Sequence, residues 1–153
     1  MPLPAITASR TPVNDLPFLF PGQAQKEAYV NEALARLDAL VQPVVLGEAG
    51  SPPADPGAGD SYLVAGGAAG GWAGHDRDIA VWAESQWLFL PPHPGARVFD
   101  LAHGTFAHYD AVDGWQRVVA PALPTGGSIQ DSEARGAIAS LVSALCAAGV
   151  FSD

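Results

Sequence analysis

The sequence is poor in the residues on which several functional classes depend. Among its 153 residues there is one cysteine, Cys146, which excludes an intrachain disulfide and a cysteine-based zinc site. Seven basic residues stand against sixteen acidic ones, and a net charge of −9 gives no electrostatic attraction to nucleic acid or to an anionic membrane surface. No apolar run approaches the ~18 residues of a membrane-spanning helix, and the N-terminus lacks the features of a secretory signal. We therefore expect binding to neither nucleic acid nor membrane.

What the sequence has in abundance is glycine and proline, 17 and 14 residues, together with four tryptophans. This composition predicts many turns around a packed core. We expect an α+β fold: a small antiparallel β domain of hairpins, flanked by an N-terminal and a C-terminal helix, with an extended N-terminal arm. The expected segments are the arm at 1–21, a helix at 22–41, the β-rich domain at 42–122, and a linker with the C-terminal helix at 123–153.

The arm carries five prolines, and each favours extended backbone in the residue before it. Its end is strongly apolar and needs a cover. Either it folds back on its own domain or it lies along a neighbouring subunit or partner. For the second alternative, the docking residues are Leu16, Phe18, Leu19 and Phe20.

The helix expected at 22–41 has an apolar stripe in which residues recur at spacings of three and four. Such a stripe packs on its own domain or on another copy of the chain, and the sequence leaves both open. The residues of this oligomer face are Val30, Leu34, Leu37 and Val41, with Ala33 and Leu40 on the same stripe. Glu27, Asn31 and Asp38 are expected to keep the remaining face polar.

Two aromatic-bearing hairpins are predicted within the β region. One joins residues 78–82 to 87–90, and the other joins 105–109 to 115–118 through Asp113-Gly114, a strong hairpin signal. Trp82 and Trp87 in the first hairpin correspond to Tyr109 and Trp115 in the second, which indicates a weak internal repeat. Residues 62–64 and 97–100 are further strand candidates.

A glycine-dense loop at 66–75 separates the first of these strands from the first hairpin. It lacks the Gly-Lys-Ser/Thr ending of a phosphate-binding loop and the spaced glycines of a dinucleotide site. We expect a tight surface turn whose one large side chain, Trp72, is held against the sheet.

The C-terminal helix is predicted over 131–148, with Asp131 as its N-cap and Gly149 after its last turn. Val150 is expected to fold back toward Leu145. The apolar face of this helix consists of Ala134, Ile138, Leu141, Val142, Leu145 and Ala148.

No catalytic constellation is present in the sequence. There is no HExxH pattern, no serine elbow and no cofactor motif, so we expect no enzyme activity and no cofactor. His103 and His108 lie at adjacent strand ends and, with Asp100 or Asp110, form the one arrangement that could hold a metal. Ordinary surface histidines are the simpler interpretation, and no metal is expected.

Binding of a neutral polysaccharide is a second hypothesis. Aromatic faces stack on sugar rings while carboxylates accept hydrogen bonds from hydroxyls. Small β domains also use tryptophan as core, and we expect at least two of the four to be core. The candidate glycan-binding residues are Trp72, His75, Asp76, Trp82 and Trp87.

Several blocks of the sequence resemble a family of phage and gene transfer agent proteins, many of them in head-spike or tail-fibre contexts. The blocks are residues 18–27 (FLFPGQAQKE), 31–41 (NEALARLDALV), 59–64 (GDSYLV), 71–76 (GWAGHD), 79–82 (IAVW) and, more loosely, 133–138 (EARGAI). Among such proteins the chain is most similar to the base of a gene transfer agent head spike.

This resemblance implies a structural protein, made in the bacterial cytoplasm and located on the head of a phage-like particle. A spike base would bind the capsid protein at a vertex and carry a spike fibre protein, supporting adhesion to the recipient cell and its capsular polysaccharide. A vertex position implies a closed homo-oligomeric ring such as a pentamer.

Overall fold

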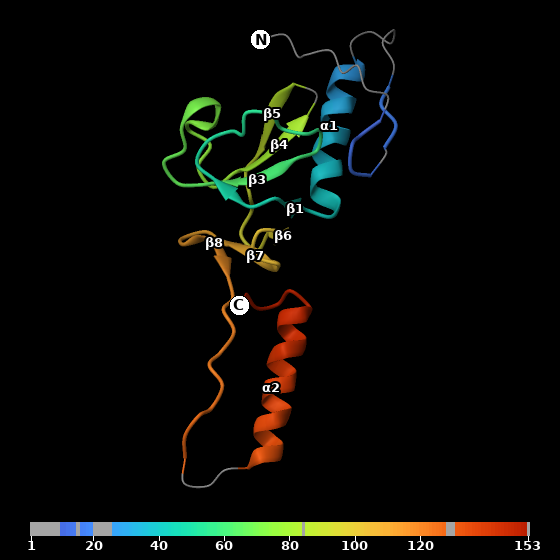
Figure 1. Cartoon of the computed structure of the whole chain (residues 1–153). Helices are drawn as coiled ribbons and strands as arrows, with labels where there is room; N and C mark the ends of the chain where they lie inside the picture. The colour runs from blue at the N-terminus through green and yellow to red at the C-terminus, as the bar shows by residue number, and fades with distance from the viewer. Residues whose placement is uncertain (1–9, 15, 20–25, 84, 128–130, 153) are drawn as a thin grey trace.

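A computed structural model describes residues 10–14, 16–19, 26–83, 85–127 and 131–152. Among the elements of these residues, helix α1 (Lys26–Val41) is the first and helix α2 (Ser132–Ala147) the last. Between them lie eight strands in two four-stranded sheets and one 3₁₀ turn, η1 (Gly70–Trp72). The expected α+β architecture, with a mostly antiparallel β domain between two helices, is confirmed (Figure 1).

The two sheets have the same plan, a two-residue strand followed by three antiparallel strands. One sheet has the order β2-β3-β4-β5, with strands Glu48–Ala49, Ser61–Val64, Ile79–Ala83 and Gln86–Leu90. The other has the order β1-β6-β7-β8, with strands Val44–Val45, Arg97–Asp100, Thr105–Asp110 and Gly114–Arg117. Each two-residue strand pairs in parallel with its neighbour. The short segment 44–49 therefore joins the edges of both sheets.

Both predicted hairpins form, and the two aromatic pairs occupy equivalent places in them. Trp82 pairs directly with Trp87 across β4 and β5, and Tyr109 pairs directly with Trp115 across β7 and β8. The ring centroids are 5.0 and 5.3 Å apart, respectively. Register between antiparallel strands thus produces the repeat that the sequence indicates.

The sheet β2-β3-β4-β5 is covered on both faces, which explains its continuous apolar strands. The core on one face lies between this sheet, α1 and the other sheet, and the core on the opposite face surrounds Trp72 of η1. Successive residues of β4, such as Ile79 and Ala80, belong to the two cores in turn. This follows from the alternation of side chains across a strand.

Helix α1 packs with a different face from the one that its apolar stripe predicts. Asn31, Ala35 and Asp38 are buried, whereas Val30, Leu37 and Val41 are exposed. The expectation that Asn31 and Asp38 lie on a polar outer face is therefore wrong. Their burial is possible because the segment before α1 supplies hydrogen-bonding groups to both side chains, from Thr11, Val13 and Leu19.

Helix α2 has the predicted ends. The Asp131 carboxylate accepts hydrogen bonds from the backbone N–H groups of Glu133 and Ala134, at 3.0 and 2.9 Å. After the last turn, Gly149 has φ +69° and the N–H of Val150 donates to the carbonyl of Leu145 at 2.9 Å, which completes a Schellman-type end. Figure 1 shows α2 extending away from the two sheets, with only its C-terminal end close to them.

Neither helix of the described chain is long and apolar enough to cross a membrane.

Candidate functional site

The described part of the predicted arm folds back along α1 instead of running extended. The N–H of Thr11 donates to the carbonyl of Leu16 at 2.9 Å, and the N–H of Leu16 donates to Thr11 Oγ1 at 3.0 Å. Arg10 forms a β-bridge with Pro17. Asp38 of α1 holds this turn, because its carboxylate accepts hydrogen bonds from Thr11 Oγ1 at 2.7 Å and from two backbone N–H groups, those of Val13 and Asn14. Residues 10–14 and 16–19 are therefore part of the domain.

The apolar end of the arm is held by Asn31. Its side-chain amide accepts from the N–H of Leu19 at 2.8 Å and donates to the Leu19 carbonyl at 3.0 Å, as a paired strand would. Phe18 beside it is only 7% exposed and belongs to the main core. The prediction that Phe18 docks on a partner is corrected: Phe18 is a core residue of its own chain.

The other arm residues have different positions. Leu16 is half-buried and Leu19 is exposed, so of these two Leu19 has the more accessible side chain. Phe20 lies outside the described residues. A small open cavity of about 210 Å³ lies beside the arm, lined by Val13, Asp38 and residues of the β1 and β3 region.

The predicted oligomer face of α1 is largely accessible. Val30, Leu37 and Val41 are 41%, 53% and 62% exposed. Leu34 differs, because it is half-buried and packs against the main core. The accessible apolar surface of α1 therefore follows Tyr29, Val30, Leu37, Leu40 and Val41, all of which are exposed.

Trp72 is removed from the glycan-binding candidates because it is completely buried. Its ring lies 5.0 Å from that of Trp87 in an edge-to-face arrangement and 5.8 Å from that of Tyr62. The indole Nε1 of Trp72 is buried without a hydrogen-bond partner among the described residues. Trp72 therefore closes the second core, as the sequence of the glycine-dense loop predicts.

Burial and the nearby Asp60 raise the pKa of Tyr62, which keeps its hydroxyl protonated.

His75 and Asp76 occupy the turn between this loop and β4. The His75 ring stacks on Phe89 with centroids 3.5 Å apart, and its Nδ1 lies 3.0 Å from the carboxylate of Asp78. Asp76 is exposed, and its carboxylate accepts a hydrogen bond from the N–H of Ala68 at 3.1 Å. Both side chains already have protein partners that explain their positions.

Trp82 and Trp87 are the candidate sugar-binding tryptophans that are not fully buried, although Trp87 also packs against the second core. Both are half-buried and lie next to the β4–β5 turn. Trp87 also contacts Tyr62, with ring centroids 6.2 Å apart. The predicted five-residue glycan surface is thus reduced to a two-ring patch, with Asp76 and His75 on the neighbouring turn.

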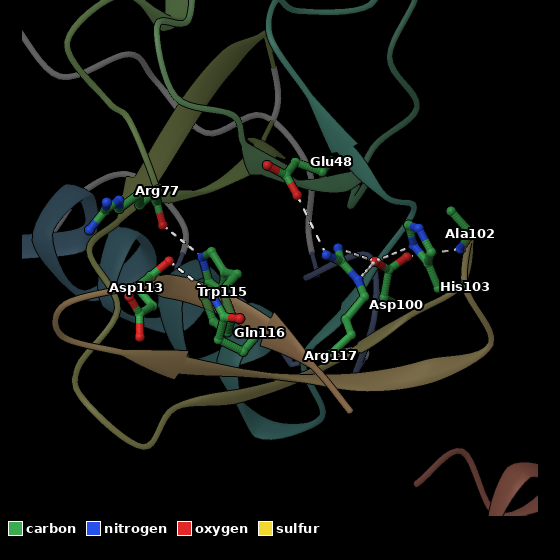
Figure 2. A network of polar contacts seen from close by, with 9 residues as sticks. All are labelled: Glu48, Arg77, Asp100, Ala102, His103, Asp113, Trp115, Gln116 and Arg117. Atoms are coloured by element: carbon green, nitrogen blue, oxygen red, sulfur yellow. Dashed lines mark hydrogen bonds and ion pairs between the residues drawn. The ribbon is translucent and has the colours of Figure 1, made fainter. Parts of the chain in front are cut away.

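A polar network that the sequence analysis does not predict joins the two sheets. Asp100, at the end of β6, is fully buried and receives the Arg117 guanidinium, with Nε at 2.7 Å. Arg117 also lies 3.6 Å from Glu48 of the other sheet. Figure 2 shows Arg117 of β8 between these two carboxylates, with His103 on the far side of Asp100.

Asp100 is held in its ionised form by this network. Burial alone would raise the pKa of Asp100, but hydrogen bonds and charge from Arg117 and His103 outweigh it and bring the pKa below its ordinary value. The N–H of Ala102 donates to the same carboxylate at 3.0 Å. In the sequence, Asp100 is recognisable only as an acidic residue at the end of a strand. Its pairing with Arg117 depends on the sheet register, which the sequence does not give.

The metal-binding alternative finds no supporting geometry. Over the residues that the structure describes, no three His, Cys, Asp or Glu side chains come together in a way that could hold an ion. His103 pairs with Asp100, whereas His108 lies opposite Arg97 and Gln116 in the sheet. Asp110 instead organises the β7–β8 turn, since it accepts from the N–H groups of Val112 and Asp113, and these bonds lower its pKa.

The β domain just described is the part of the chain that identifies its family. Residues 30–116 match a family described as protein of unknown function (DUF2793). The chain belongs to the DUF2793 family. The matched segment includes most of α1 and the eight strands almost to the end of β8, and α2 lies beyond it. A search of curated proteins finds no match to the chain.

Proposed function

We propose that this chain is a structural component of a phage-like particle, namely the base of a gene transfer agent head spike. In this role it attaches a spike fibre protein to a capsid vertex and supports adhesion to the recipient cell. It acts as a homo-oligomer, such as a pentamer, without catalytic activity. The proposal starts from the resemblance of residues 18–27, 31–41 and 59–64 to such proteins.

The structural observation that supports the proposal most is the apolar surface of both helices. The α1 surface runs from Tyr29, which is 71% exposed, to Val41. All sixteen residues of α2 are described and none is buried. A small domain that covers the sheet β2-β3-β4-β5 on both faces, yet leaves apolar side chains of two helices in water, has the surface of a subunit that packs against other proteins.

Particle composition tests this proposal. In a bacterium that produces gene transfer agents and encodes this chain, we expect an epitope-tagged copy to purify with the particles and to be labelled by gold-conjugated antibody at the head. Leu37→Asp on α1 should reduce incorporation, whereas Leu101→Asp, at an equally exposed turn position, should not. Intact spiked particles that contain none of the chain would reject the proposal.

A glycan-binding attachment module is the alternative, and the Trp82–Trp87 pair is the observation that favours it. The two rings are 5.0 Å apart at a hairpin end and half-exposed. Two adjacent aromatic rings can stack against successive sugar units. Capsular polysaccharide would then be a direct ligand of this chain.

Retention on immobilised capsular polysaccharide distinguishes this alternative. Trp82→Ala should reduce retention, and Tyr109→Ala, in the equivalent place of the other hairpin, provides the matched control. Equal retention of the wild-type chain on capsule and on a bare matrix would rule the alternative out. Trp72→Ala is not informative for binding, because that ring is core.

A further inference from the structure

The last part of the chain forms an arm that is firmly attached at its base. We define the C-terminal arm as residues 118–152, which comprise the linker after β8 and helix α2. At its base, Ser152 donates to the carbonyl of Val118 at 2.8 Å and accepts from the N–H of Ala120 at 3.2 Å. The two ends of the arm are therefore joined as neighbouring strands.

The base is also bonded to the sheet β1-β6-β7-β8. The carbonyl of Gly149 accepts hydrogen bonds from the N–H of Phe106 at 2.8 Å and from Thr105 Oγ1 at 2.9 Å. Thr105 is fully buried. Farther out, Arg135 donates to the carbonyl of Pro124 at 2.8 Å, which links the helix to its linker. The contacts of Gly149 and Ser152 hold the C-terminal end of α2 at the sheet, and the rest of the helix, toward its N-terminus, extends away from the sheets (Figure 1).

The surface that α2 presents has the spacing of a helix-pairing seam. Ala134, Ile138, Leu141 and Leu145 follow one another at intervals of four, three and four residues, and Ala148 continues the series after three more. This is the heptad spacing at which two helices interlock side chains, with Ile138 and Leu141 in the a and d positions. Ile138 is 45% and Leu141 60% exposed, whereas Leu145, nearer the base of the arm, is half-buried. No residue of the fully described helix is buried by its own chain.

The charge distribution favours a second copy of the same chain as the partner. Asp131, Glu133 and Arg135 are the only charged residues between positions 118 and 152 in the sequence, whereas the whole chain carries −9. Two acidic subunits repel each other least where their surfaces carry little charge. Beyond Arg135, the seam is uncharged along the rest of α2. A strongly basic partner would find no matching acidic groups along this face.

In α1, by contrast, the heptad-spaced series is interrupted. Leu34 falls between Val30 and Leu37 in that series, but it packs into the core of its own domain. Its side chain is therefore not available to a facing helix. Of the two helices, α2 is the one whose seam residues belong to neither of the two hydrophobic cores.

We infer that α2 is the self-association element of this protein, packing along the Ala134–Ile138–Leu141–Leu145 seam against α2 of another copy. The inference deepens the proposed function, and it rests on that function only for the expectation of a homo-oligomer. It assigns the subunit contact to the C-terminal arm, which lies outside the segment that matches the family.

Sedimentation of the full-length chain over a range of protein concentrations tests the inference. The wild type should form a species whose mass is a multiple of 15.7 kDa. Leu141→Asp should weaken association by roughly a hundredfold, because pairing would remove a carboxylate from water without a partner. Leu101→Asp introduces the same charge at a 53% exposed turn residue and should leave the mass unchanged. Far-UV circular dichroism and thermal unfolding establish that each variant folds.

Two outcomes overturn the inference. A wild type that stays at 15.7 kDa at every concentration would show that the chain does not self-associate. Particle incorporation can still be measured in that case, and it tests the proposed function separately. An oligomer that survives Leu141→Asp but dissociates with Leu37→Asp places the contact on α1. Leu141 is not buried in its own chain, so we expect Leu141→Asp to fold. If that variant does not fold, Ile138→Gln tests the same seam, with the same predicted loss of association.

Discussion

The indole Nε1 of Trp115 donates a hydrogen bond to the backbone carbonyl of Arg77 at 2.8 Å, which ties the last strand of one sheet to the loop before β4 of the other. Arg77 has a left-handed backbone, with φ +71°, a conformation that non-glycine residues seldom adopt. Its guanidinium also donates to the carbonyl of Val112 in the β7–β8 turn, at 3.3 Å. Two contacts therefore join the sheets in Figure 2: the hydrogen bond from Trp115 to Arg77 and the ion pair between Arg117 and Glu48.

Replacing Trp115 with Phe should reduce the stability of the joined sheets. The variant keeps an aromatic ring beside Tyr109 but loses the hydrogen bond to Arg77, which should cost about 1 kcal/mol plus some packing. Urea unfolding measures the change. Trp82→Phe is the matched control, since that indole lies at the tip of the other hairpin. Equal losses in the two variants would contradict a special role for the Trp115–Arg77 bond.

Asp100→Asn should change how stability depends on pH. The pKa of Asp100 is lowered in the folded state, so the wild-type carboxylate contributes stability above its unfolded pKa of about 3.9 and loses it as the pH falls through the folded value. At pH 7 the variant should be less stable by about 3 kcal/mol, because Arg117 loses its buried partner. The difference between the two proteins should shrink below about pH 4.

Denaturant unfolding of both proteins from pH 7 to pH 3 measures this difference. Asp110→Asn is the control, because the pKa of Asp110 is also lowered but its side chain is exposed in a turn. Stability curves for wild type and Asp100→Asn that remain parallel throughout would show that ionised Asp100 contributes nothing.

Asp38→Ala should release the segment at 10–14 from α1. The carboxylate receives three hydrogen bonds, and their loss should cost about 2–3 kcal/mol. Amide hydrogen exchange should accelerate at Val13 and Asn14. Asn31→Ala provides a crossed control, because it should accelerate exchange at Leu19 while Val13 and Asn14 stay protected. Unchanged exchange in Asp38→Ala would mean that other contacts hold the segment.

Gly149→Ala should loosen the base of the C-terminal arm. At φ +69° a side chain is strained, and the new Cβ would lie 2.7 Å from the Phe99 ring, so we expect a loss of about 2 kcal/mol or more. Faster exchange of the Phe106 amide, which bonds to the Gly149 carbonyl, reports this locally. Gly136→Ala, in the open middle of α2, should instead stabilise the helix by about 0.5–1 kcal/mol. A neutral Gly149→Ala would contradict the tight packing of the base.

The elements that sequence analysis locates well are those whose signals are local. Asp131 caps α2 and Gly149 ends it because both act on backbone groups within one turn. The hairpin at Asp113-Gly114 has Gly114 at φ +79°, a conformation that favours glycine. The correspondence of Trp82–Trp87 with Tyr109–Trp115 was also readable, because a hairpin's turn sets its register.

The candidate sites were harder to predict because they depend on contacts distant in sequence. The Asp100–Arg117 pair spans 17 residues across the sheet, and the Asp38–Thr11 bond spans 27. Two-residue strands such as β1 carry too little pattern to be recognised, and the parallel pairing of β1 places Val44 opposite Phe99, which lies far later in the chain. Trp72 could not be assigned to core or surface until its loop had a sheet to cover.

By itself the sequence determined the α+β class, the hairpins, the two helices and the end signals of α2, since each follows from periodicity or from a turn. Only the tertiary structure decided which apolar side chains are inside. It buried Phe18 and Trp72, turned Asn31 and Asp38 of α1 inward and left Ile138 and Leu141 of the α2 seam exposed to water. The physical reason is that burial requires a partner surface and satisfied hydrogen bonds, and distant segments of the folded chain supply both.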